Sequence, residues 1–307
     1  MTLLVADEVR LTVEGDRPVV GLETSVIGQG LPFPRNLECV DRMERAIRDA
    51  GALPAWTAVL DGAVRVGLER GELERIGTPD VATKVARRDL PVAVASGAVG
   101  ATTVSATIWA AARAGVSICA TGGIGGVHPS TRGDTTIDVS ADLLELASTP
   151  VLLVCSGPKS IVDPVATVER LEELGVAVVG YGVDRLPFFL AREAPVELEH
   201  RVDTPAEAAA IAAVQRRLGA NAAVLLCNPI AAEHALDPDD LLAATRRAEE
   251  RMRDAGVEGK AVTPFLLAAL AEETAGRSLE ANLVLLEDNA RLAADVAVAL
   301  SAARSGR

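Results

Sequence analysis

Short apolar runs alternate with longer amphipathic segments along almost the whole chain. This alternation predicts strands that are each followed by a helix, and hence an α/β fold with a mostly parallel sheet and helices on both faces. Strands are expected at residues 19–23, 55–60, 92–95, 116–121, 151–155, 177–181 and 223–227. Helices are expected at 36–50, 104–114, 142–147, 164–174, 205–218, 238–254, 264–274 and 279–303. We interpret residues 1–307 as a single α/β domain, because no internal repeat or low-complexity linker interrupts the pattern.

The longest irregular-looking stretch covers residues 183–204. It could mark a domain boundary. A loop that folds over a binding site is the alternative, because the stretch carries Phe188 and Phe189, two of only four phenylalanines in the chain.

The balance of charge limits the partners of this protein. The formal net charge is −13 at pH 7, which argues against a nucleic-acid polymer, because phosphate backbones need a basic surface. A small phosphorylated ligand remains compatible with this charge, since one local pocket can oppose the overall sign.

Cysteine usage and apolar runs indicate the compartment. The four cysteines form no CxxC pair, and three of them lie in or beside apolar, strand-like runs, so we expect buried free thiols and a reducing cytoplasm. The first twenty residues lack the pattern of a signal peptide, and no uncharged apolar run is long enough to span a bilayer.

Candidate chemical residues gather at the predicted strand ends, where open α/β sheets bind their ligands. They are Glu23, Lys84, Thr102, Thr103, the loop 122–126, Lys159 and Asn228. Lys159 follows a buried strand and a Gly157-Pro158 turn. Partial desolvation there would favour the neutral amine, which can attack a carbonyl-like carbon. For Lys84 the alternative to a role in the site is a solvated basic patch with Arg87 and Arg88.

Two further features suit a phosphate ester and acid catalysis. Thr102 and Thr103 follow a glycine-rich turn and precede a predicted helix, so hydroxyls and free N–H groups could bind an anion. Ordinary helix capping is the alternative. Glu23, at a strand end, could be a general acid if burial favours its protonated form, or simply a surface or capping residue.

A cluster of oxygen ligands follows the loop 122–126. Asp134, Asp138 and Asp142 recur every four residues after His128. Such hard ligands suit Mg²⁺ or Mn²⁺, usually with retained waters, although capping and loop hydrogen bonds would explain them too. Neither a Walker motif nor a GxGxxG fingerprint is present, and no Ser-His-Asp or Cys-His pattern emerges.

Many segments together resemble the pseudouridine-5′-phosphate glycosidases, also called indigoidine synthase A-like proteins. They occur in the family's order and cover roughly residues 18–300. The segments are LETSVIGQGLPFPRNLE, AVLDGAVRVGL, KVARRDLP, GATTVSATIWAA, ATGGIGGVHP, TTIDVSADLLELA, VCSGPKSIVD, GYGVDRLPFFLAR, NPIAAEHALDPDDL, GKAVTPFLLA and RSLEANLVLLEDNARLAA.

The resemblance implies a role for individual residues. Lys159 matches the nucleophile that forms a Schiff base with the ring-opened sugar phosphate, Glu23 matches the proton donor, and Asp138 matches the metal ligand, usually of Mn²⁺. The substrate-binding positions are Lys84, Val104 through its backbone N–H, Ser140, Ala141, Asp142 and Asn282, to which we add Thr103 and His128.

The resemblance also implies a reaction and an assembly. The expected enzyme is a metal-dependent homotrimer, of the carbon–oxygen lyase type, that interconverts pseudouridine 5′-phosphate with uracil and ribose 5-phosphate. An accessory or biosynthetic protein that forms a C-glycoside with another base is the alternative. The sequence departs from the family at Gln29, where a histidine is common, and at Ser156-Gly157-Pro158, where Ala-Gly-Ala is frequent.

Overall fold

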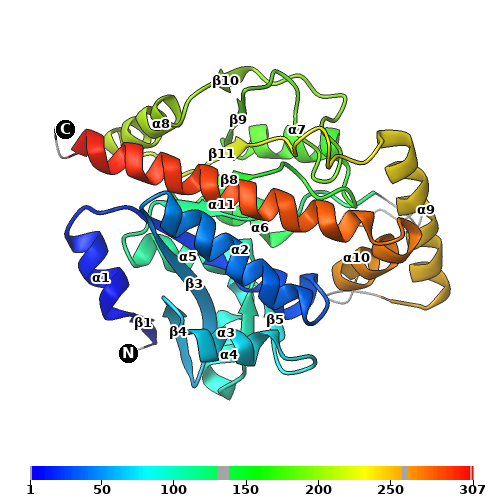
Figure 1. Ribbon diagram of the computed structural model, residues 1–307, viewed down its shortest axis with the longest axis horizontal. Coiled ribbons are helices and arrows are strands. Elements are labelled where there is room, and N and C mark those ends of the chain that lie inside the picture. The colour runs from blue at the N-terminus through cyan, green and yellow to red at the C-terminus, as the bar shows by residue number, and fades with distance from the viewer. Residues whose placement is uncertain (1, 130–137, 258–261, 305, 307) are drawn as a thin grey trace.

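The computed structural model describes residues 2–129, 138–257, 262–304 and 306, and their strands form one sheet (Figure 1). The main path of the sheet runs β1-β4-β3-β2-β7-β8-β11-β9-β10, and β6 joins β3 to β5. Every pairing is parallel except β3 with β4 and β3 with β6, so the predicted mostly parallel sheet is confirmed. The strands are β1 (Leu3–Val5), β2 (Val19–Glu23), β3 (Leu53–Leu60), β4 (Ala63–Val66), β5 (Thr83–Val85), β6 (Gly100–Thr102), β7 (Ile118–Ala120), β8 (Leu152–Cys155), β9 (Ala177–Tyr181), β10 (His200–Val202) and β11 (Val224–Cys227).

All eight expected helices are present with shifts of one or two residues at their ends, and six of the seven expected strands are confirmed. The helices are α1 (Asp7–Glu14), α2 (Arg35–Asp49), α3 (Arg70–Gly77), α4 (Leu90–Ser96), α5 (Val104–Arg113), α6 (Ala141–Leu146), α7 (Pro164–Glu173), α8 (Pro205–Leu218), α9 (Pro238–Asp254), α10 (Val262–Glu273) and α11 (Arg277–Arg304). A π-helical turn, η1 (Val26–Gly30), and a 3₁₀ turn, η2 (Arg87–Asp89), complete the set.

The expected strand at 92–95 is wrong, because these residues lie in helix α4. A short apolar run has no periodicity that separates a strand from a buried helical turn. The flanking residues decide the outcome here. A proline at the first helical positions fits a helix start, and Gly97 ends the helix in the left-handed region with φ of 65°.

The β3–β4 hairpin was not expected, although the sequence contains an Asp-Gly pair, which is typical of a hairpin turn. Asp61 and Gly62 connect the two strands with φ of 50° and 75°. Two positive φ values suit the tight hairpin turn that Asp-Gly favours. As a result, β3 pairs antiparallel with β4 on one side and parallel with β2 on the other.

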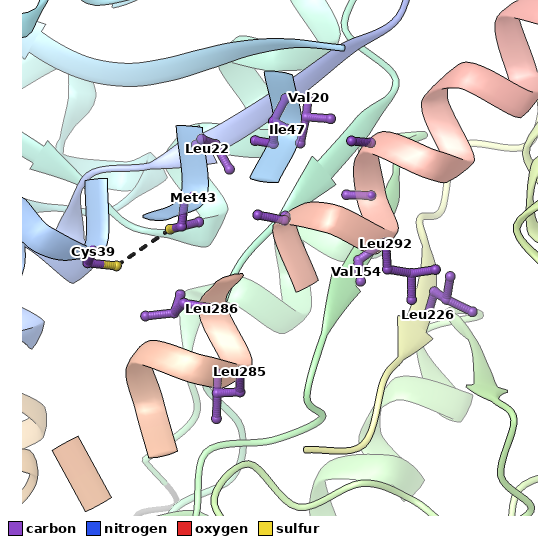
Figure 2. Close-up of a cluster of buried hydrophobic side chains, with 14 of the residues drawn as sticks. Val20, Leu22, Cys39, Met43, Ile47, Val154, Leu226, Leu285, Leu286 and Leu292 are labelled. Carbon is purple, nitrogen blue, oxygen red and sulfur yellow. Dashed lines mark hydrogen bonds between the residues drawn. The ribbon is translucent and has the colours of Figure 1, made fainter. Parts of the chain in front are cut away.

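Helices cover both faces of the sheet, as predicted. Side chains of β2, β8 and β11 alternate between two hydrophobic clusters: Val154 lies in the first and Leu153 in the second. The first cluster packs under α2, α8, α9 and α11, and the second under α1, α5, α6 and α7. Figure 1 shows α2 and α11 side by side across the front of the sheet, with α5 and α6 behind it. Figure 2 shows part of the first cluster, with Leu22 from β2, Met43 from α2 and Leu286 from α11 among its labelled side chains.

Buried thiols were expected, and all four cysteines are buried and free. Burial raises the pKa of Cys39 and of Cys119 to about 12. The pKa of Cys227 is also raised, first by its hydrogen bond with Cys155 and then by burial. Among the described residues, no helix is both long and apolar enough to cross a membrane.

Candidate functional site

A cavity of about 300 Å³ lies beyond the carboxyl ends of β2 and β7, beside the N-terminus of α5. The structure brings to its wall all eleven residues to which the sequence analysis gave a catalytic, substrate-binding or metal-binding role. They are Glu23, Lys84, Thr103, Val104, His128, Asp138, Ser140, Ala141, Asp142, Lys159 and Asn282. Asn228, a further candidate at a strand end, is not on this wall. Asp134 lies outside the described residues. Thr102 does not line the cavity; its side chain is fully buried, and its hydroxyl donates to the carbonyl oxygen of Thr57 at 2.5 Å.

The loop after β7 and the loop after β8 run together and hold Lys159 in place. The N–H of Ser156 donates to the Gly122 oxygen at 2.8 Å, and the N–H of Lys159 donates to the Ile124 oxygen at 2.9 Å. Gly157 has φ of 77°, and a Cβ there would collide with the carbonyl oxygen of Pro187. The backbone of Lys159 is therefore fixed on both sides, while its half-buried side chain faces the cavity.

The carboxyl group of Glu23 is held at the end of β2. It is only 5% exposed, and both of its oxygens accept hydrogen bonds from hydroxyls. Ser25 Oγ donates to Oε2 at 2.5 Å, and Thr121 Oγ1 donates to Oε1. These two hydroxyls, which the sequence analysis did not single out, fix the direction in which the carboxyl group points.

Asp142 connects the start of α5 to the glycine-rich loop. Its Oδ1 accepts from the N–H of Ser105 and its Oδ2 accepts from the N–H of Gly125, each at 3.0 Å. Thr103 Oγ1 bonds Ser105 Oγ at 3.0 Å instead of capping the helix. None of the hydrogen bonds found among the described residues uses the N–H of Val104, which is therefore available to an anion at the positive end of the helix.

His128 lies close to the acidic and basic groups of the cavity. Its backbone N–H donates to the backbone oxygen of Asp138 at 2.9 Å. Burial lowers the pKa of His128, and the positive charges of Lys84 and Lys159 act in the same direction. The Asp138 carboxylate and a hydrogen bond with the backbone of Ile161 oppose that shift of the His128 pKa.

The donors near Asp138 fit a hydrated ion better than a fully ligated one. Within the described ranges, no group of three or more His, Cys, Asp or Glu side chains could hold a metal. The Asp138 side chain is exposed, and both oxygens of Asp142 already accept N–H groups. A divalent cation at Asp138 would therefore keep most of its water ligands, as Mg²⁺ commonly does.

Two asparagines of α11 have different surroundings. Asn282 lines the cavity. Asn289 is fully buried, donates to the Thr121 oxygen at 2.9 Å, and accepts from Asn228 Nδ2 at 3.0 Å. It also bonds Ser156 Oγ at 3.1 Å. Asn289 thus ties the ends of three strands together below the cavity, a role that an isolated asparagine in a helix does not reveal.

Gln29, Arg88 and Phe189 are among the further residues that line the cavity. Gln29 lies in η1, and its Nε2 donates to the Ala82 oxygen at 3.1 Å. The N–H of Phe189 donates to the Ser156 oxygen at 2.6 Å. Within the irregular stretch 183–204, the part around Phe189 therefore lies against the lysine loop.

Comparisons with known proteins identify relatives over nearly the full length. Residues 8–299 match the model of a family described as indigoidine synthase A like protein. A pseudouridine-5′-phosphate glycosidase of Symbiobacterium thermophilum is 46% identical over 97% of both chains. Another, from Herpetosiphon aurantiacus, is 48% identical over 97% of this chain and 98% of its own.

Solved structures agree with these sequence matches. The prealnumycin C-glycosynthase AlnA, in complex with ribulose 5-phosphate, superimposes with a TM-score of 0.89 at 39% identity and covers 100% of this chain and 99% of its own. An indigoidine synthase A-like protein of Thermotoga maritima gives 0.88 at 37% identity, over 98% and 97%.

Proposed function

The chain belongs to the indigoidine synthase A-like family, and we propose that it is a C-glycosidase that reversibly cleaves pseudouridine 5′-phosphate to uracil and ribose 5-phosphate. The observation that carries this proposal is one cavity that combines an amine, a buried carboxyl group and an unused helix N–H. These groups are Lys159, Glu23 and Val104.

The bond to be broken explains why an amine is needed. Pseudouridine joins ribose C1 to uracil C5 by a carbon–carbon bond, so protonation of a glycosidic oxygen, the usual glycosidase device, is not available. Lys159 Nζ would bond to ribose C1 as the bond between C1 and the ribose ring oxygen, O4, breaks and that oxygen takes a proton. The nitrogen lone pair then forms a C=N bond while the C1–C5 bond breaks, and water hydrolyses the iminium to free lysine and ribose 5-phosphate.

Glu23 would supply the proton that uracil C5 needs as it leaves. A lysine committed to the iminium cannot supply it, and Glu23 is a buried carboxyl group that lines the same cavity. Its two hydroxyl partners, Ser25 and Thr121, orient the carboxyl group before substrate arrives. General acid–base catalysis of this kind typically contributes about 10²- to 10⁴-fold in rate.

The phosphate group would occupy the start of α5. The N–H of Val104 is an unused donor at this place. Thr103 adds a hydroxyl, and Lys84 adds a positive charge on the same wall. We further propose that Ser140, Ala141, Asn282 and His128 complete the walls around the sugar and base.

Asp138 would hold the metal, Mn²⁺ or Mg²⁺, largely through water. When bound, such an ion adds positive charge beside an anionic substrate. The protein's own part is to keep an exposed carboxylate next to His128 at the edge of the cavity.

The decisive experiment follows C–C cleavage and covalent trapping together. Purified protein is incubated with pseudouridine 5′-phosphate and Mn²⁺, and uracil is quantified; the reverse reaction is run from uracil and ribose 5-phosphate. Borohydride with ribose 5-phosphate should leave a sugar-phosphate adduct on wild type and none on Lys159→Ala. Normal turnover by Lys159→Ala would refute the Schiff-base mechanism, and absence of uracil from wild type would refute the substrate.

A second candidate function is synthesis of a different C-glycoside. An adjoining groove of about 1090 Å³ shares Gln29, Phe189 and Asn282 with the cavity, and Leu31 and Phe33 are among its apolar lining residues. The fold also matches a protein named as a C-glycosynthase. This candidate predicts that electron-rich aromatic acceptors compete with uracil for ribose 5-phosphate, which chromatography of the products tests.

We propose a homotrimer as the assembly. Light scattering in solution should give three times the mass of the chain, and a monomer would refute this part of the proposal.

A further inference from the structure

Arg87 and Arg88 are consecutive residues of the 3₁₀ turn η2, but their side chains have different surroundings. The turn follows β5 and is closed by Asp89, whose Oδ2 accepts from the N–H of Ala86 at 3.0 Å. The turn is also fixed against α5, because the N–H of Arg87 donates to Ser105 Oγ at 3.3 Å. The backbone therefore positions both arginines next to the first turn of that helix.

Arg87 is committed to the scaffold. Its guanidinium lies 4.4 Å from the ring centroid of Trp109, and Arg113 covers the same ring at 4.2 Å. Its Nε lies 3.7 Å from a carboxylate oxygen of Glu145. Arg87 does not line the cavity, and its charge instead interacts with Trp109 of α5 and Glu145 of α6.

Arg88 is the arginine that lines the cavity, together with Thr103 and Val104. Its side chain is 74% exposed, and the only ion pair found for it among the described residues is a long one, 3.9 Å to Asp89 Oδ1. Asp89 also accepts the N–H of Ala86. An exposed guanidinium on the wall of the cavity is thus available to an incoming anion.

We propose that Arg88 closes on the phosphate group of the substrate and sets the preference for the phosphate ester over the free nucleoside. This inference rests on the proposed function. The protein carries a net charge of −13, and Glu23, Asp89, Asp138 and Asp142 line the cavity, so a phosphate dianion needs local positive charge to enter. A guanidinium offers two parallel N–H donors to phosphate, in addition to the single N–H of Val104.

The test compares variants at neighbouring positions. Arg88→Ala should raise KM for pseudouridine 5′-phosphate by roughly 10- to 100-fold, the scale of one lost charge-assisted hydrogen bond, with kcat nearly unchanged. Turnover of unphosphorylated pseudouridine, measured at the same substrate concentration, should be equal in wild type and Arg88→Ala. Arg88→Lys should recover part of the lost affinity, because lysine keeps the positive charge but lacks the two parallel N–H donors of the guanidinium. Arg87→Ala is the matched control: it removes the same charge and should lower the melting temperature without changing the preference for the phosphate ester.

Calorimetry separates this inference from the proposed function. Wild type should bind ribose 5-phosphate more tightly than ribose, and Arg88→Ala should lose most of that difference, whatever reaction the protein catalyses. Equal binding of ribose 5-phosphate by wild type and a folded Arg88→Ala would overturn the inference. An equal loss in Arg87→Ala would also overturn it, because general surface charge would then explain the effect. If Arg88→Ala does not fold, Arg88→Gln replaces it in the same comparison.

Discussion

Asn289 and Asn282 lie two turns apart on α11, and we expect their replacement by leucine to have opposite consequences. Asn289→Leu fills the same buried space but removes the partner of two buried groups, the Thr121 oxygen at 2.9 Å and Ser156 Oγ at 3.1 Å. Each buried polar group left unpaired costs about 1–3 kcal/mol, which gives roughly 2–6 kcal/mol for the two. For a chain of this length, 4 kcal/mol corresponds to a fall in melting temperature of about 6–8 °C.

Asn282→Leu is the control. No hydrogen bond of the Asn282 side chain is found among the described residues, and the residue lines the cavity. We expect its melting temperature to stay within about 2 °C of wild type, while turnover of pseudouridine 5′-phosphate falls. Calorimetric unfolding and uracil release on the same preparations measure both properties. A wild-type melting temperature for Asn289→Leu would show that its hydrogen bonds contribute no net stability, and equal destabilisation by both variants would refute the distinction between them.

Three further experiments test the proposed roles of Glu23, Asp138 and Asp142. Glu23→Gln keeps the shape of the side chain but cannot donate the proton, so kcat should fall by about 10²-fold or more with binding of ribose 5-phosphate retained; unchanged turnover would assign the proton to another group. Removal of metal by a chelator should abolish activity and Mn²⁺ should restore it, with a higher Mn²⁺ requirement in Asp138→Ala; full activity after exhaustive chelation would contradict a metal at this site. Asp142→Ala leaves the N–H groups of Ser105 and Gly125 unpaired, so urea unfolding should show a loss of roughly 2–6 kcal/mol, and wild-type stability would refute this structural role.

The sequence predicts the sheet well because its strands are buried on both faces. Continuous apolar runs such as Val224–Cys227, followed by polar turns and amphipathic helices, leave few other folds. The pattern fails where an element is too short or too amphipathic to be separated from a loop. The strands β1, β5 and β10 have three residues each, and their pairing partners, not their own composition, make them strands.

The gathering of the candidate residues around one cavity was predictable for a topological reason. Parallel strands end at the same edge of the sheet, so Glu23 and Lys159, more than one hundred positions apart, line one cavity. What the sequence does not contain is the state of each side chain. Asp138 and Asp142 look equivalent as metal ligands, yet Asp142 accepts two backbone N–H groups and Asp138 is exposed.

Backbone pairing, more than side-chain packing, positions the proposed nucleophile. The β7–β8 pairing continues past both strand ends, through the bond from the Ser156 N–H to the Gly122 oxygen and the bond from the Lys159 N–H to the Ile124 oxygen. Such bonds do not depend on side-chain identity at the loop positions, so the side chains of Ser156 and Pro158 are not needed to hold the backbone of the lysine. The requirement falls instead on Gly157, where the carbonyl oxygen of Pro187 leaves no room for a Cβ and φ is 77°. A Gly157→Ala variant should therefore lose activity while Lys159 itself is intact, and wild-type kcat in that variant would show that the loop has more freedom than this geometry allows.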